Sequence, residues 1–254
     1  MAGTALFGRR VMWRVATVVA LRDETPTART LTLDVPDWPG HIADQHVDVR
    51  VTAPDGYSAV RSYSIASAPD SHTRIELTIE RLANGEVSPY LTQVVAPGDR
   101  FEVRGPIGGW FVWRTEQYEP VQLIAGGSGI VPLMAMIRSR VSAKNTSQFR
   151  LLYSVREPGA VFYRDELLAL ATEDRSVIVM YAYTRTVPKD WPRPPGRVNA
   201  ALIADATWPS VLAPTCYVCG PTSFVENLTA LLTASGNERD KIKTERFGST
   251  GERK

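Results

Sequence analysis

The chain has 254 residues, of which 44% are hydrophobic and 22% are charged, and its formal net charge is +2. This composition is typical of a globular protein with one large domain or two ordinary ones, and so small a charge gives no indication of a nucleic-acid partner. Residues 1–10 hold too short an apolar stretch for a signal peptide, and no apolar run reaches the length of a membrane span, so we expect a cytoplasmic protein.

Residues 10–115 alternate apolar and polar side chains, for example along 46–51, 75–79 and 101–104. A period of two is typical of half-buried strands, and turn signals rich in Gly, Pro, Asn and Asp separate the runs. One brief helix is expected around 88–94. Many short strands with a single short helix predict a small antiparallel β-barrel.

Residues 118–254 have a different pattern, in which nearly continuous apolar runs alternate with helical segments. The apolar runs lie at 121–125, 151–155, 177–183 and 216–219, and the helices are expected at 132–141, 165–172, 199–204 and 222–233. Strands buried on both faces read this way in parallel sheets, so the pattern predicts a doubly wound α/β domain.

The chain has only two cysteines, Cys216 and Cys219. Two thiols provide no disulfide framework, and they are too few for the four thiolates of a plant-type iron–sulfur cluster. Their spacing is that of a redox CxxC pair. Because the segment Cys216-Tyr-Val-Cys219 is apolar and leads into Gly-Pro, we expect a buried strand end instead of a redox or zinc pair.

The segment from Arg61 to Ser64 has the side chains that a flavin nucleotide requires. Tyr63 offers a stacking surface, Ser64 a hydrogen-bond donor, and Arg61 a forked cation for phosphate. An ordinary surface strand would contain the same residues. Further along, Gly85-Glu-Val-Ser88-Pro89 predicts a helix with Ser88 at its N-cap and Pro89 at its first position, which would suit a pyrophosphate or would simply cap a helix.

Two later turns follow buried strands. The run from Gly126 to Gly129 opens a helix, the context that a phosphate cradle requires, although it is not the usual G-x-G-x-x-G pattern and a tight turn would also explain it. Cys219 ends the last buried strand, where a small thiol would fit beside a nicotinamide or pack as a small hydrophobic residue.

Taken in order, the motifs R-x-Y-S at 61–64, G-P-x-G at 105–108, G-G-S-G-I-x-P at 126–132, C-G-P at 219–221 and E-x-F at 245–247 resemble those of the ferredoxin–NADP reductase superfamily. The resemblance runs from about residue 14 to 248 and is closest to stand-alone flavin reductases similar to oxygenase reductase components, without the iron–sulfur domain. It implies two domains, an antiparallel β-barrel that binds FAD followed by an α/β doubly wound parallel sheet that binds NAD(P)H.

The resemblance also implies the site residues. The catalytic residues would be Ser64 near the flavin N5, Cys219 near the nicotinamide C4, and Glu245 near the flavin; no metal site is expected. The cofactor-binding residues would be Arg61, Tyr63, Ser64, Ile79, Arg81, Gly85, Val87 and Ser88 on the barrel, and Gly126, Gly127, Ser128, Gly129, Thr184, Arg185, Cys219, Gly220, Pro221 and Phe247 on the α/β domain. Residues 249–254 extend past Phe247, so this aromatic would not be a terminal lid.

The expected function is an FAD-dependent oxidoreductase that takes hydride from NAD(P)H and passes electrons to a separate acceptor, such as a ferredoxin or a partner oxygenase or other oxidoreductase. Thr184 and Arg185 favour NADPH, with NADH as the alternative. A flavin-bearing electron-transfer subunit active only within a larger complex is a second hypothesis. A non-catalytic nucleotide-binding module with a decayed flavin site is a third.

Overall fold

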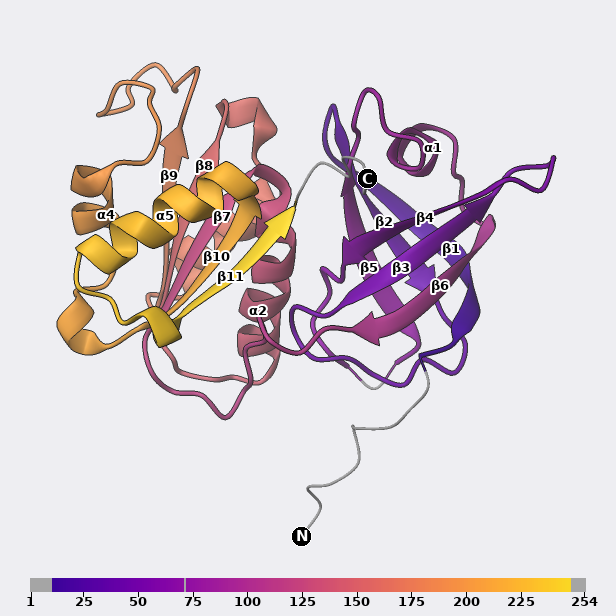
Figure 1. Ribbon diagram of the computed structural model, residues 1–254, viewed down its shortest axis with the longest axis horizontal. Coiled ribbons are helices and arrows are strands. Elements are labelled where there is room, and N and C mark those ends of the chain that lie inside the picture. Colours follow the sequence, from indigo (N-terminus) through magenta and orange to yellow (C-terminus); the bar gives the residue numbers. More distant parts are fainter. Residues whose placement is uncertain (1–10, 71, 248–254) are drawn as a thin grey trace, which may run out of the picture.

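The computed structural model describes residues 11–70 and 72–247, and Figure 1 shows two lobes side by side. The first lobe is a β-barrel and the second a parallel sheet flanked by helices. We expected no signal peptide in residues 1–10, and we expected that the tail at 249–254 keeps Phe247 from being a terminal lid. Both segments lie outside the described residues.

The first lobe is a six-stranded antiparallel sheet in the order β4-β3-β6-β1-β2-β5. Its strands alternate as expected: Val47 and Val49 of β3 and Ile75, Leu77 and Ile79 of β5 are fully buried in one core. The elements are β1 (Trp13–Thr25), β2 (Ala28–Asp34), β3 (His46–Thr52), β4 (Ser58–Ser64), β5 (Arg74–Glu80), α1 (Ser88–Gln93) and β6 (Arg100–Ile107).

The two outer strands of this sheet also meet. Ile65, directly after β4, forms an antiparallel bridge with Leu77 of β5, and the amide of Ala66 donates to the carbonyl of Glu76 at 2.7 Å. This contact closes the sheet on itself, and it confirms the predicted antiparallel barrel.

The second lobe is a five-stranded parallel sheet in the order β11-β10-β7-β8-β9. Its elements are β7 (Val121–Gly126), η1 (Gly127–Gly129), α2 (Ile130–Ser142), β8 (Phe149–Val155), η2 (Pro158–Ala160), α3 (Arg164–Glu173), β9 (Val177–Tyr183), α4 (Ala200–Ala206), η3 (Ser210–Leu212), β10 (Thr215–Pro221), α5 (Thr222–Ala234), η4 (Arg239–Lys241) and β11 (Ile242–Phe247). The predicted boundaries at residues 115 and 118 lie in the segment between β6 and β7.

Helices cover both faces of this sheet. One apolar cluster joins α2 and α3 to one face, and a second joins α4 and α5 to the other. The sheet is therefore doubly wound, as predicted. Cys216 lies in the second cluster and Cys219 in the first, on opposite faces of β10, and both are buried free thiols, as the strand-end interpretation expects.

The two lobes contact each other through a domain seam, which we define as the contact of the barrel with α2, α3 and β11. Arg138 of α2 donates to the carbonyl of Ala66 at 2.9 Å and to Glu76 at 2.9 Å, and its outer nitrogen pairs with Glu166 of α3. Tyr163, just before α3, donates through its hydroxyl to Thr78 of β5. The barrel is thus tied to the α/β domain by polar contacts as well as by apolar packing.

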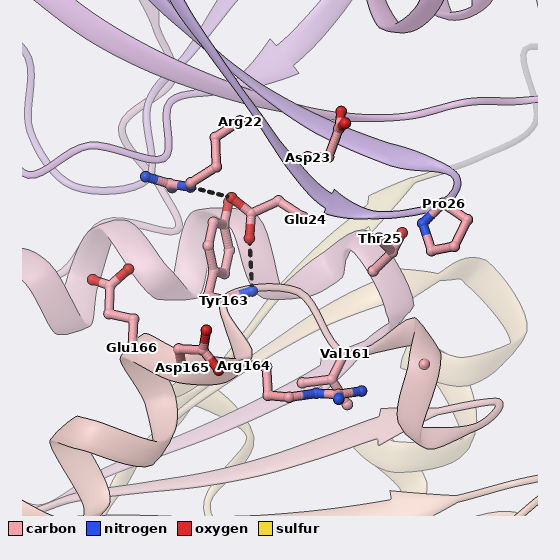
Figure 2. Close-up of a pocket in the computed structure, with 11 residues that line it drawn as sticks. Arg22, Asp23, Glu24, Thr25, Pro26, Val161, Tyr163, Arg164, Asp165 and Glu166 are labelled. Atoms are coloured by element: carbon pink, nitrogen blue, oxygen red, sulfur yellow. Dashed lines mark hydrogen bonds and ion pairs between the residues drawn. The ribbon is translucent and has the colours of Figure 1, made fainter.

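A hollow lies in this seam between the β1–β2 hairpin and the start of α3 (Figure 2). Figure 2 shows Glu24 accepting hydrogen bonds from Arg22 and from the amide of Tyr163, at 2.9 Å each. The hollow contains none of the predicted site residues. We therefore interpret it as part of the contact between the domains.

Among the described residues, no helix is long and apolar enough to cross a membrane.

Candidate functional site

The strand order places a topological switch point between β7 and β10. From β7 the chain proceeds outward to β8 and β9, and it then returns to the other side of β7 to form β10 and β11. In open α/β sheets, ligands bind at the carboxyl ends of the strands at this point. The predicted glycine turn follows β7 there, and Cys219 lies near the end of β10.

The glycine turn is held against β10 by contacts that only glycine permits. A Cβ atom on Gly129 would lie 2.2 Å from the carbonyl oxygen of Cys219, and one on Gly126 would lie 2.8 Å from the ring of Phe224. Gly127 has a φ of +55°, and the turn Gly127–Gly129 leads directly into α2 without a side-chain cap. The first amides of this helical segment therefore remain free for an anion, as a nucleotide phosphate requires.

Cys219 and Glu245 are neighbours in the sheet, because they stand opposite each other in the register of β10 and β11. Cys219 is fully buried, and burial, reinforced by the nearby carboxyls of Glu245 and Asp44, raises the pKa of its thiol well above the ordinary value. The thiol is therefore neutral at physiological pH. It offers a small, polarizable surface and not a nucleophile.

Glu245 meets a residue that sequence reasoning missed. Its carboxyl lies in hydrogen-bond contact with that of Asp44, from the loop between β2 and β3. Nothing in the sequence around Asp44 indicated a site, because its partner comes from the other domain and its own neighbours form no motif.

Ser64 ends β4, where it pairs with His46 in the register of β3. It is 5% exposed, and its hydroxyl has no hydrogen-bond partner among the residues that the structure describes. Buried hydroxyls normally have a partner, so an unpaired one fits a bound ligand that completes it. Ser64 lies two residues before Ala66, whose carbonyl accepts from Arg138 across the seam.

Arg61 lies three residues before Ser64 on β4 and is half-exposed. Its guanidinium pairs with Glu86 at 3.0 Å, and the hydroxyl of Tyr57 also donates to Glu86. Because Glu86 lies within the segment from Gly85 to Ser88, the structure brings together two of the predicted phosphate contacts. Glu86 was not predicted.

The prediction that Ser88 is an N-cap is wrong. Val87 is the cap residue, Ser88 is already helical, and Pro89 is at the second position. The Ser88 hydroxyl instead accepts from the amide of Leu82 at 3.1 Å, and a Cβ on Gly85 would lie 2.7 Å from that hydroxyl oxygen. The serine fixes the preceding loop, and the glycine allows the close approach.

The remaining predicted residues of the barrel differ in how far their side chains are buried. Tyr63 is partly buried against the barrel core, and burial raises its pKa to about 12. Arg81 lines a shallow hollow with the β1–β2 hairpin and Thr92. The side chain of Ile79 is fully enclosed in the barrel core, so only its main chain would face a ligand.

Thr184 and Arg185 follow β9 at the same edge of the sheet as Cys219. Their amides donate to the carbonyls of Val155 and Arg156, at 2.9 Å each, and the side chain of Arg185 is exposed. Three interstrand spacings of about 4.8 Å separate β10 from β9, or about 14 Å. The predicted residues at the two ends of this row therefore do not touch, and only an extended ligand would contact both.

The other members of the predicted set lie around the switch point. Phe247 stands opposite Pro221 in the register of β11 and β10. It is partly buried and packs against the apolar cluster that joins α2 and α3 to the sheet. Gly220 packs on Phe224 and on the main chain of Gly126, so it joins the two turns. The side chain of Ser128 is half-exposed on the glycine turn.

Comparison with known proteins agrees with this arrangement. Residues 17–112 match the family described as an oxidoreductase FAD-binding domain, and residues 123–229 match the oxidoreductase NAD-binding domain. The FAD/NAD-binding domain of nitric oxide dioxygenase from Vibrio cholerae superposes with a TM-score of 0.82 at 23% identity, covering 93% of this chain and 99% of that one.

Two curated relatives are similar over most of the chain. The ferredoxin reductase component of 3-ketosteroid-9-alpha-monooxygenase from Mycolicibacterium smegmatis is 30% identical over 243 residues, 93% of this chain and 65% of the relative. The flavohemoprotein of Bordetella pertussis is 29% identical over 255 residues, 94% of this chain and 61% of the relative. The chain spans between 53% and 66% of the length of such curated relatives.

The FAD-binding and NAD-binding matches fall on the barrel and on the parallel sheet, and the glycine turn, Cys219 and Glu245 meet at the switch point between the sheet's halves. The chain therefore belongs to the ferredoxin–NADP reductase superfamily, with an FAD-binding barrel followed by a nicotinamide-nucleotide-binding α/β domain.

Proposed function

We propose that the chain is an FAD-dependent reductase that takes hydride from NADPH and passes the electrons to a separate acceptor, such as a ferredoxin or a partner oxygenase. The observation that carries the proposal is the buried hydroxyl of Ser64, which no described residue satisfies. Ser64 ends β4, two residues before Ala66, whose carbonyl accepts from Arg138 of α2 across the seam. Once bound, the nicotinamide supplies a hydride and the flavin accepts it, so the protein has to align the two rings.

The chain's own residues support distinct roles in that alignment. Ser64 would donate its hydroxyl hydrogen to the flavin, and Arg61 with the loop from Gly85 to Ser88 would hold its pyrophosphate. The amides of the glycine turn would hold the nicotinamide nucleotide's phosphates, because they open a helix without a cap. Cys219, neutral and small, would leave room for the nicotinamide ring.

Composition supports an acceptor outside these 254 residues, and a relative supports its being a separate protein. The two cysteines of these 254 residues are too few to hold an iron–sulfur cluster of four thiolates. The Mycolicibacterium smegmatis relative is named as the ferredoxin reductase component of a monooxygenase. The Bordetella pertussis relative is a flavohemoprotein, which favours the alternative of a flavin-bearing electron-transfer unit active only within a larger assembly.

The preference for NADPH is supported by the exposed guanidinium of Arg185 at the end of β9. A forked cation is a fitting partner for the dianionic 2′-phosphate, which NADH lacks. The hydroxyl of Thr184, partly buried beside it, would add a hydrogen bond.

The test is an anaerobic titration of the purified, FAD-loaded chain with NADPH and with NADH, followed by flavin absorbance. NADPH should bleach the flavin stoichiometrically, and ferredoxin or a small acceptor should restore the colour. A protein that carries no flavin would contradict the proposal. Reduction without turnover on either acceptor would instead support the assembly-dependent alternative.

The nucleotide preference is tested in the same titration with Arg185→Ala. The apparent affinity for NADPH should fall about five- to tenfold, a modest change because an exposed arginine is screened by water and salt, while that for NADH stays constant. Arg175→Ala is the matched control, because this exposed arginine precedes β9 at the opposite end of the same strand. Equal effects of both variants would refute the role of Arg185.

A further inference from the structure

A buried contact in the domain seam joins two carboxyl groups. The carboxyl of Asp44, from the barrel domain, meets the carboxyl of Glu245, from β11 of the α/β domain. We call these two side chains the carboxyl pair. Asp44 is only 5% exposed, so water does not solvate its charge.

Neither side chain has a conventional partner at the contact. Asp44 Oδ1 and Glu245 Oε2 are both buried, and neither receives a hydrogen from any donor in the part of the chain that the structure describes. Two carboxylates in a buried contact repel each other strongly, and they are compatible with this geometry when one proton lies between them.

The proton belongs on Asp44. Burial, followed by the charge of Glu245, raises the pKa of Asp44 well above its ordinary value. Burial also raises the pKa of Glu245, but the hydrogen bond from Asp44 acts against that rise. Asp44 is also the more deeply buried of the two side chains, so it is the carboxylic acid that donates, and Glu245 is the carboxylate that accepts.

No group around the carboxyl pair donates to its two buried oxygens in the described part of the chain, although the charge of Lys243 acts to lower the pKa of Asp44. The ionisable groups that face the pair are Tyr217 and Cys219 from β10 and Lys243 from β11, with Glu119 and Arg114 beyond Lys243. Burial raises the pKa of Tyr217 and of Cys219, so both stay neutral. The ammonium of Lys243 donates to the carbonyl of Val112 at 3.4 Å. Next to Asp44 in the barrel loop stand only uncharged residues, Ile42, Ala43 and Gln45.

The backbone does not explain why a carboxyl is present. Asp44 has a φ of +84°, in the left-handed region that favours glycine and that aspartate and asparagine tolerate better than most other residues. A glycine would adopt this turn without strain and without burying a polar group. The side chain is therefore best explained by its contact with Glu245.

We propose that Asp44 is a positioning residue for Glu245: it holds the shared proton and hydrogen-bonds across the domain seam to the Glu245 carboxylate, fixing that carboxylate beside Cys219. The inference rests on the proposed function and on the place near the flavin that the family resemblance implies for Glu245. Loss of the proton at higher pH leaves two carboxylates in contact, and Glu245 then loses its fixed place.

The proton itself is tested by infrared spectroscopy of the full FAD-loaded chain at neutral pH. We expect a protonated-carboxyl C=O band that shifts in D2O and is absent from Asp44→Asn. Asp48→Asn is the matched control. Burial acts to raise the pKa of Asp48, but hydrogen bonds from Ser62 and Arg104 lower it, so Asp48 is ionised and this variant should keep the band. A wild-type chain without the band, or a band retained in Asp44→Asn, would overturn the proposal.

The positioning role is tested by the rate of flavin reduction across pH. Asp44→Ala should slow reduction about tenfold, the worth of one hydrogen bond to a charged group. Asp44→Asn should restore the rate, because its amide N–H also donates to Glu245, and should remove the fall in rate at high pH, because the amide has no proton to lose. An asparagine variant as slow as the alanine variant would contradict the role.

A third measurement needs no nicotinamide, so it separates this proposal from the proposed function. The unfolded chain loses the Asp44 proton above about pH 4, whereas the folded chain keeps it. Stability should therefore fall as pH rises above 4, until the folded pair titrates. The unfolding equilibrium constant should rise up to about tenfold per pH unit more steeply in the wild type than in Asp44→Asn. Identical slopes would refute the shared proton even in an active reductase.

Discussion

At the scale of single residues, Ser64 combines deep burial with a hydroxyl that no described residue satisfies. Removing such a hydroxyl deprives the folded protein of no internal hydrogen bond. Ser64→Ala should therefore change the free energy of unfolding by less than about 0.5 kcal/mol. If the hydroxyl serves the flavin, the same variant should slow hydride transfer about tenfold with little loss of FAD, measured by stopped-flow absorbance.

The neighbouring Ser62 is the control for this prediction. Its hydroxyl donates to Asp48 at 2.7 Å, so Ser62→Ala should lose about 1 kcal/mol of stability and leave the reduction rate unchanged. An unchanged reduction rate in Ser64→Ala would remove Ser64 from the proposed site.

Motif reasoning reached the residues whose chemistry is local. Arg61 and Ser64 stand in a recognisable pattern. The structure leaves Arg61 half-exposed beside Glu86 and leaves the Ser64 hydroxyl without a partner among the described residues, and their cofactor roles stay predictions. Asp44 and Glu86 were missed because each acquires its meaning from a partner far away in the chain, across the seam for Asp44 and across the barrel for Glu86. No pattern of spacing records such a contact before the chain is folded.

At the scale of elements, the glycine turn between β7 and α2 depends on close packing against β10. A Cβ at Gly129 would lie 2.2 Å from the carbonyl oxygen of Cys219, a main-chain atom that cannot rotate away. Gly129→Ala should therefore lower the free energy of unfolding by about 3 kcal/mol, measured by denaturant titration.

Gly109→Ala is the matched control, since a Cβ there would meet nothing within 4 Å. Its effect should stay within about 0.5 kcal/mol. Comparable losses in both variants would mean that the turn relaxes and that its packing on β10 is not essential.

The strands and helices of both domains could be predicted from the spacing of apolar residues, because burial on one face or on two faces imposes that spacing. The start of α1 could not be predicted in this way. Ser88 has the composition of a cap, but the amide of Leu82 competes for its hydroxyl, and this tertiary hydrogen bond displaces the cap to Val87. The closure of the barrel by Ile65 and Leu77 could not be derived either, because it depends on the register of two strands that are not consecutive in the sheet.

At the scale of the whole molecule, Arg138 is the main polar link across the seam. Its side chain is 14% exposed, and it joins α2 to the barrel through Ala66 and Glu76 and to α3 through Glu166. Arg138→Ala would leave Glu166 without its cation and Glu76 with only Arg22, at 3.9 Å, which should cost about 3 kcal/mol. It should also slow flavin reduction, because the two domains would no longer be held in one alignment.

Arg140→Ala is the control on the same helix. Arg140 is similarly buried, but its partners, Ser147, Asp174 and Ser176, all belong to the α/β domain. It should lose comparable stability without slowing the flavin reduction rate. Equal rates in the two variants, measured by stopped flow at saturating nucleotide, would show that Arg138 only stabilises the fold.

The placement of the two cysteines on opposite faces of β10 has a practical consequence. The barrel has no cysteine, and burial raises the pKa of Cys216 to about 12 and that of Cys219 well above the ordinary value. A thiol-modifying reagent therefore reacts only when the centre of the parallel sheet opens. The intact protein thus contains a natural chemical reporter for transient opening of its nucleotide-binding half, separate from any motion of the flavin-binding half.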